Sequence, residues 1–387
     1  MALVWGSNGV LVVCAGVQKR VHLPALTSLR GVAAVWVVLY HFQDVLRAAG
    51  AVPAPLARLV GHGHYAVDLF FLLSGYVIAY NYLDLPRPLE RRTCFRFLFM
   101  RLARIYPAHL VGLLAVVPMV LAARLMGMGL TDEGYGLVAF VQHLTLTQAW
   151  VPFMKLSWNY PAWSVSAEWF AYLSFPVLAV GLRRVRGMAA NILLLAGCAG
   201  LLSVGGFLPH TAPFRELWRV MLAFPVGMAL FHVSRTLRPA TWLPRGVALL
   251  SSAGLLLALM AEGVPHRLFF VLFAVLLWAL SELRPGDLSA FCARPLVWLG
   301  EVSYSLYICH ALVQKVLNEL LPARALEALP LPQRVLGLGL YAGLLLGSAY
   351  GMWRLVEEPS RRFLKRVLDR TAPDARGEPA APVVPGA

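Results

Sequence analysis

The chain has 387 residues, of which 59% are hydrophobic and only 14% are charged, and its formal net charge is +15. Because soluble domains typically contain about 25% charged residues, this composition excludes an ordinary soluble protein and indicates a polytopic membrane protein. The positive charge does not indicate a nucleic-acid ligand, since the basic residues form no single patch and recur between apolar segments, as the positive-inside rule expects.

Apolar runs of spanning length predict an all-α bundle of about ten transmembrane helices around a central cavity. With the N-terminus in the cytoplasm, about two-thirds or more of the Lys and Arg residues fall on the cytoplasmic side. Residues 1–25 are expected to form an interfacial or disordered leader, and the Pro- and Ala-rich residues 367–387 a disordered cytoplasmic tail. The predicted spans are residues 26–46, 64–83, 101–125, 162–182, 189–208, 214–234, 246–262, 266–283, 296–320 and 334–356.

The first predicted span contains two ionisable residues, Arg30 and His41, which are eleven positions apart. This spacing is about three helical turns, so both side chains share one stripe of the helix and lie about 16 Å apart along it. Ionisable groups in a bilayer are costly and usually face a cavity, which makes the pair a candidate functional site. The alternative is a snorkelling arginine at the helix end and a buried, hydrogen-bonded histidine.

The next two spans carry further charges. Asp68 lies near the outer end of the second span, where it either serves a functional site or caps the helix. Arg101 and Arg104 share one face at the cytoplasmic end of the third span. Two guanidinium groups on one face are suited to hold phosphate oxygens, although positive-inside anchoring explains them equally well.

Two later spans carry polar residues on single helix faces. Ser164 and Glu168 are four positions apart and follow Trp163; an interfacial tryptophan is ordinary, but a glutamate in an apolar helix is not. Glu168 is expected to orient a histidine or to accept a substrate hydroxyl. In the ninth span, a polar stripe predicted to face the protein interior or a solvated cavity consists of Ser303, Tyr307, His310 and Gln314.

The five cysteines contain no Cys-x-x-Cys pair, so the sequence predicts neither a disulfide framework nor a metal site. They are Cys14, Cys94, Cys198, Cys292 and Cys309.

Several motifs, taken together, resemble those of the membrane acyltransferase-3 family in order and spacing, from about residue 25 to 365. They are Arg30-x10-His41, VDLFFLLSGY, RLARIYP, WSVSAEW, LGEVSYSLYICH and VEEPSRRF. The resemblance marks residues 26–366 as the transmembrane domain. The chain departs from the family at Thr27 and Ser28, where many members have Asp-Gly, and at Ala66, where a glycine is usual.

The resemblance implies a bacterial inner-membrane enzyme that moves an acyl group, often acetyl, from cytoplasmic acyl-CoA to a hydroxyl at the outer face. The acceptor would be a carbohydrate or a related molecule such as a lipid-linked glycan, with membrane lipids as neighbours and no nucleic acid. The family's site residues map onto Arg30 and His41, onto Arg101 and Arg104, and onto Trp163, Ser164 and Glu168.

These observations combine into one mechanistic hypothesis. His41 acts as general base or acyl carrier, helped by Glu168 or Asp68. A thioester is already activated, so no metal is required. The remaining assignments are acyl-CoA phosphates at Arg30, Arg101 and Arg104, and substrate at Trp163, Ser164, Tyr307 and His310. The alternative is a transporter or polysaccharide-export component without acyl chemistry, which would explain the basic cavity and the polar stripes equally well.

Overall fold

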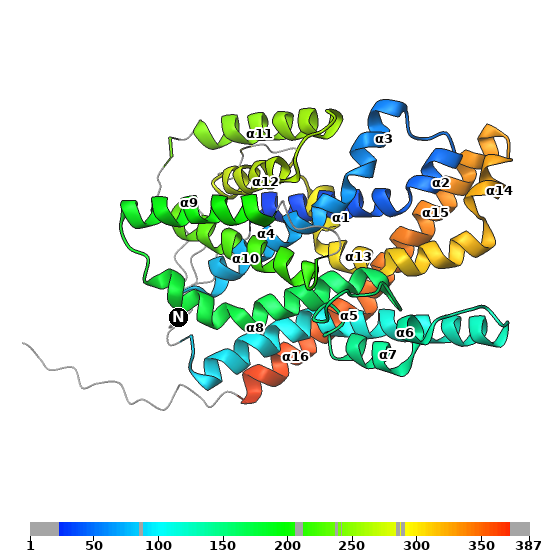
Figure 1. Ribbon diagram of the computed structural model, residues 1–387, viewed down its shortest axis with the longest axis horizontal. Helices are drawn as coiled ribbons and strands as arrows, with labels where there is room; N and C mark the ends of the chain where they lie inside the picture. Colours follow the sequence, from blue (N-terminus) through cyan, green and yellow to red (C-terminus); the bar gives the residue numbers. More distant parts are fainter. Residues whose placement is uncertain are drawn as a thin grey trace, which may run out of the picture.

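The computed structural model describes residues 23–371, apart from 85–87, 206–211, 237–238, 241, 284–286 and 288–290. Nearly all of the predicted leader and tail therefore lies outside the described residues. Within them the secondary structure is entirely helical, and most helices run roughly along the long axis of the molecule (Figure 1). The prediction of an all-α protein is confirmed.

The α-helices are α1 (Pro24–His41), α2 (Gln43–Ala48), α3 (Ala54–Gly61), α4 (Ala66–Tyr82), α5 (Arg91–Leu125), α6 (Asp132–Tyr135), α7 (Leu137–Leu144), α8 (Trp163–Arg183), α9 (Met188–Gly205), α10 (Arg215–Ser234), α11 (Leu243–Met260), α12 (His266–Ser281), α13 (Arg294–Leu320), α14 (Ala323–Glu327), α15 (Leu331–Met352) and α16 (Glu358–Thr371). Two 3₁₀ turns, η1 (Gly63–Tyr65) and η2 (Tyr160–Ala162), precede α4 and α8, and a π-helical segment, η3 (Trp353–Glu357), joins α15 to α16.

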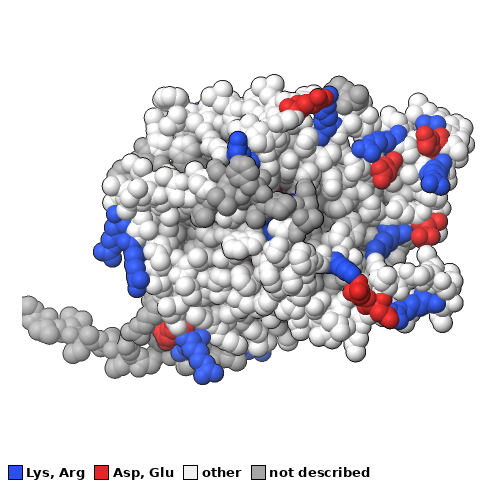
Figure 2. All heavy atoms as spheres, viewed as in Figure 1, with Lys and Arg blue, Asp and Glu red and all other residues white. Residues whose placement is uncertain are grey.

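Six helices in the described part of the chain are long and apolar enough to cross a membrane. The chain is therefore a multi-pass membrane protein, but the predicted number of ten spans is not confirmed. Of the other four predicted spans, those at α9 and α12 contain apolar helices shorter than a full span, and those at α1 and α4 are not among the candidates. The six helices are Arg91–Leu125, Tyr160–Arg183, Arg215–Ser234, Leu243–Met260, Arg294–Leu320 and Leu331–Leu368. Figure 2 shows charged side chains mainly toward the ends of the molecule, with broad uncharged surface between them.

Two predicted spans differ from the structure in their bounds. The first span, 26–46, is broken at Phe42, so that His41 is the last residue of α1 rather than a mid-helix position. The break leaves the His41 carbonyl oxygen to accept a hydrogen bond from Gln314 Nε2 on α13. The third span, 101–125, begins earlier, at Arg91, because its basic first turns extend the helix beyond its apolar part.

Glycines allow the two closest helix crossings. At the α1–α13 crossing, Gly31 lies against the backbone of Gly300, and a methyl group at Gly300 would overlap the Thr27 carbonyl oxygen. At the α4–α10 crossing, Gly75 lies against the Phe224 carbonyl oxygen and Gly227 against that of Leu72. Small residues let membrane helices approach until their backbones touch. These contacts place α1 and α4 at the centre of the site described next.

Candidate functional site

A cavity of about 690 Å³ lies between α1, α4, α5, α8 and α13. Its wall includes Arg30, Arg101, Arg104 and Glu168, so the structure brings together four of the residues predicted from widely separated parts of the chain. The three guanidinium groups outnumber the one carboxylate, and the cavity is therefore cationic.

Arg30 is fixed to α13 at the glycine crossing. Its Nε donates to the Gly300 carbonyl oxygen and to Ser303 Oγ, both at 3.0 Å. Ser303 is the first residue of the predicted polar stripe, which does face the protein interior. The hydrogen bonds hold the guanidinium group against the cavity wall, where a snorkelling side chain would instead extend toward the membrane surface.

Arg101 and Arg104 lie one helical turn apart on the cavity wall. Arg101 Nη2 donates to the Tyr82 hydroxyl at 2.8 Å, and its guanidinium carbon lies 5.0 Å from the centre of that ring. Arg101 Nε is buried without a hydrogen-bond partner. Among the described residues Arg104 forms no hydrogen bond or ion pair, and it lies close enough to Arg30 for their like charges to repel.

Glu168 lies on the same wall but already has two donors. Its Oε1 accepts hydrogen bonds from Ser74 Oγ and from the Tyr172 hydroxyl, each at 2.5 Å. These contacts connect α4 to α8 on the cavity wall. No contact between Glu168 and His41 accompanies them, so the carboxylate binds hydroxyl groups and does not orient that histidine in this structure.

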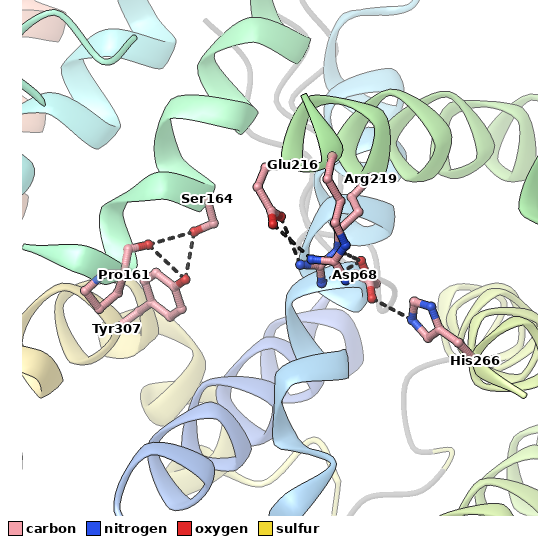
Figure 3. A network of polar contacts seen from close by, with 8 residues as sticks. Asp68, Pro161, Ser164, Glu216, Arg219, His266 and Tyr307 are labelled. Atoms are coloured by element: carbon pink, nitrogen blue, oxygen red, sulfur yellow. Dashed lines mark hydrogen bonds and ion pairs between the residues drawn. The ribbon is translucent and has the colours of Figure 1, made fainter. Parts of the chain in front are cut away.

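Ser164 and Tyr307 meet on the cavity wall. The two hydroxyl groups lie 2.8 Å apart, and the Tyr307 hydroxyl donates to the Pro161 carbonyl oxygen at 3.0 Å (Figure 3). Trp163, the residue before Ser164, packs beside the cavity under the guanidinium group of Arg219, whose carbon is 5.2 Å from the indole centre. The substrate residues predicted on α8 and α13 are thus close to one another.

Asp68 belongs to a separate buried network (Figure 3). Its carboxylate, which is 1% exposed, binds Arg219 at 3.0 Å and His266 Nε2 at 2.9 Å. Arg219 also binds Glu216 at 3.1 Å. The network connects α4 to α10 and α12, and all of its charges are paired, as buried charges require. Asp68 is not among the residues that line the cavity.

His41 lies beyond the cavity wall, half-buried at the end of α1. The centre of its ring is 5.0 Å from that of His310 and 5.2 Å from that of Tyr160. His310 in turn lies 5.5 Å from Tyr307, which lines the cavity. A row of contacting rings therefore leads from the cavity to His41. Within the described residues, no group of His, Cys, Asp or Glu is arranged to hold a metal ion.

A family model described as "Acyltransferase domain", that of acyltransferase-3, matches residues 23–353. This chain belongs to the acyltransferase-3 family. Its sequence is 31% identical to the acyltransferase MdmB of Streptomyces mycarofaciens, over 92% of this chain and 96% of that protein. It is 26% identical to the peptidoglycan O-acetyltransferase OatA of Listeria monocytogenes, over 76% of this chain and 49% of that protein. No solved structure matches the chain significantly.

Sequence reasoning missed three members of the Asp68 network in this acyltransferase-3 chain. Glu216 and Arg219 are two charged residues in an apolar helix, and this pattern alone indicates a buried polar network. His266 could not be identified in this way, because it is the first residue of α12, where a histidine is expected to lie at the membrane interface.

Proposed function

We propose that this acyltransferase-3 protein transfers an acyl group, acetyl in the simplest case, from cytoplasmic acyl-CoA to a hydroxyl of a carbohydrate or related acceptor. The acceptor would lie at the outer face of the bacterial inner membrane, with both chain termini in the cytoplasm. The proposal depends chiefly on one observation: α1 presents Arg30 to a cationic cavity and His41 to a ring cluster eleven residues later, both on the side that packs against α13.

The cavity suits the anionic part of an acyl-CoA. Among the described residues Arg104 has no hydrogen-bond or ion-pair partner, and one buried nitrogen of Arg101 has no acceptor. Buried polar groups are nearly always hydrogen-bonded, so the buried nitrogen of Arg101 calls for an acceptor, and the half-buried Arg104 beside it adds a second cationic donor for an anionic ligand. Phosphate oxygens are well matched to guanidinium groups, which bind them through charge-assisted hydrogen bonds. Such a ligand would also relieve the repulsion between Arg30 and Arg104.

The acyl end would extend past Ser164 and Tyr307 toward His41. In the transfer step, His41 takes the proton of the acceptor hydroxyl while the oxygen attacks the thioester carbonyl carbon. The carbon–sulfur bond then breaks, and His41 returns the proton to the CoA thiolate. Transfer through an acyl-imidazole on the same ring uses the same geometry. Ser164 and Tyr307, whose hydroxyl protons are already donated to the Pro161 carbonyl oxygen or to each other, would line the path of the acyl group.

The acceptor would approach from the side opposite the cavity. His41 is half-buried, and the proposal requires that the exposed part of its ring face that side. A carbohydrate acceptor is supported by the relative named as a peptidoglycan O-acetyltransferase. In this arrangement Asp68 acts at a distance, by fixing α4 against α10 and α12, whereas Trp163 and His310 shape the site around the acyl group.

The test uses membrane vesicles that contain the full chain and labelled acetyl-CoA. The variant His41→Ala should lower both CoA release and glycan labelling by about 100-fold or more, because general-base catalysis contributes at least that factor. His62→Ala, which removes a half-buried histidine that does not line the cavity, is the matched control. Near-normal acetyl transfer by His41→Ala would refute the assignment, and substrate flux without CoA release would favour a transporter.

A further inference from the structure

His310 is fully buried in α13, and among the described residues only one of its two ring nitrogens has a hydrogen-bond partner. Nδ1 lies 2.6 Å from the Tyr307 carbonyl oxygen. Because a carbonyl oxygen can only accept a hydrogen bond, Nδ1 carries the proton and Nε2 carries the lone pair. Nε2 is buried without any hydrogen-bond partner. An unsatisfied buried acceptor costs stability, so its retention beside the site calls for a donor that becomes available during function.

The aromatic rings that contact His310 indicate which group can be that hydrogen-bond donor. The Tyr160 hydroxyl donates to Gln314 Oε1 at 3.0 Å, and the Tyr307 hydroxyl donates to the Pro161 carbonyl oxygen. Neither phenol has a second proton to offer. The third ring in contact is that of His41, tilted by 30° at a centre-to-centre distance of 5.0 Å, and it has an N–H group.

We propose that His310 is the positioning residue of His41, whose ring N–H donates to the Nε2 lone pair of His310 during acyl transfer. This inference rests on the proposed function. The hydrogen bond selects the His41 tautomer whose other nitrogen is free to take the proton of the acceptor hydroxyl. His310 itself keeps its proton on Nδ1 throughout, so no proton is gained or lost at this residue.

The contact is most valuable in the transition state. When the acceptor proton reaches His41, the ring becomes cationic, and a charged N–H is a stronger donor than a neutral one. Only interactions that strengthen in the transition state accelerate the reaction. His310 would therefore supply, with a neutral ring, the orienting contact that a carboxylate supplies in a Ser-His-Asp triad. Neither carboxylate contacts His41 in the structure, since Asp68 pairs with Arg219 and His266, and Glu168 binds the hydroxyl groups of Ser74 and Tyr172.

Two amide variants separate this role from a purely structural one. Glutamine places its terminal amide near the position of the histidine Nε2, whereas asparagine places its amide near that of Nδ1. His310→Gln should retain transfer within about 10-fold of the wild type, since its amide oxygen can still accept from His41. His310→Asn should lose about 100-fold, the cost typical of removing one preorganised contact from an active site. The KM for acetyl-CoA should stay unchanged in both, because the contact lies beyond the cavity.

The measurement is acetyl transfer and CoA release in vesicles carrying the full chain, with labelled acetyl-CoA as the probe. Cys309→Ala, at the buried residue just before His310 on α13, controls for a loss of packing. If His310 serves only to anchor the Tyr307 carbonyl, Asn should be as active as Gln or more active, and that ranking would overturn the inference. If the Asn variant does not accumulate in the membrane, His310→Phe, which lacks both nitrogens, is compared with Gln instead.

The two proposals fail in different ways. A wild-type chain that releases no CoA would refute the proposed function, and the role of His310 with it. An active wild type, an inactive His41→Ala and a fully active His310→Asn would refute the role of His310 alone.

Discussion

Arg104 lines the cavity without a hydrogen bond or ion pair to any described residue. We expect Arg104→Gln to raise the KM for acetyl-CoA by about 10-fold or more, because a hydrogen bond to a charged group contributes about 1.5–3 kcal/mol. The kcat should change little, since the residue is distant from His41. Stability should change little, because Arg104 makes no hydrogen bond or ion pair with a described residue and lies near the like charge of Arg30. Steady-state kinetics and thermal unfolding of the purified variant measure the two effects.

A matched control for Arg104 lies at the other end of the same helix. Arg124 forms an exposed ion pair with Asp132, and pairs of this kind contribute little. Arg124→Gln should leave the KM unchanged. Equal KM values for the wild type and Arg104→Gln would contradict the proposal that acyl-CoA binds in the cavity.

The α1–α13 crossing sets the position of both Arg30 and His41, and Gly300 is its closest point. A methyl group at Gly300 would overlap the Thr27 carbonyl oxygen, which is backbone and cannot move without the helix. We expect Gly300→Ala to lower the thermal unfolding midpoint, by the equivalent of about 1–3 kcal/mol or more, as overpacking does. Transfer activity should fall as well, because the Arg30–Ser303 and His41–His310 contacts separate together.

Gly343 provides the comparison for this substitution, because it is helical and a methyl group there would meet no atom within 4 Å. Gly343→Ala should be neutral or slightly stabilising, since alanine favours a helix by about 1 kcal/mol over glycine. Measuring both variants by unfolding and by acetyl transfer separates the crossing from general helix propensity. A Gly300→Ala protein with wild-type stability would show that α1 can move away from α13 at no cost.

The helices and the partners of the site residues were predictable to different degrees. Hydrophobic runs located the helices well, because each run reflects burial of one local segment. They could not reveal the break at Phe42, which depends on how α13 meets the end of α1. Spacing placed Arg30 and His41 on one face of a helix and identified the stripe through His310. It could not pair residues from different helices, so the assignment of Asp68 to Arg219 rather than to His41 required the structure.

Orientation in the membrane is a property of the whole chain, and the proposed entry of acyl-CoA depends on it. The positive-inside rule places the N-terminus in the cytoplasm, which puts the loop after α2 outside and the basic loop after α8 inside. Arg47 and Arg184 mark these two loops, and both are exposed. We expect Arg47→Cys to react with a membrane-impermeant maleimide in intact spheroplasts, and Arg184→Cys to react only after permeabilisation.

The labelling is done in a background that lacks the five native cysteines. The reverse pattern would place the Arg30 end of α1 outside the cell, where acyl-CoA is absent. Acyl transfer would then need either a different acyl donor or an acyl-CoA that enters at the His41 end of α1. In both cases the cationic cavity would bind the acceptor and not the donor. The sidedness of two cysteines therefore tests which end of α1 receives the donor, independently of any measurement of activity.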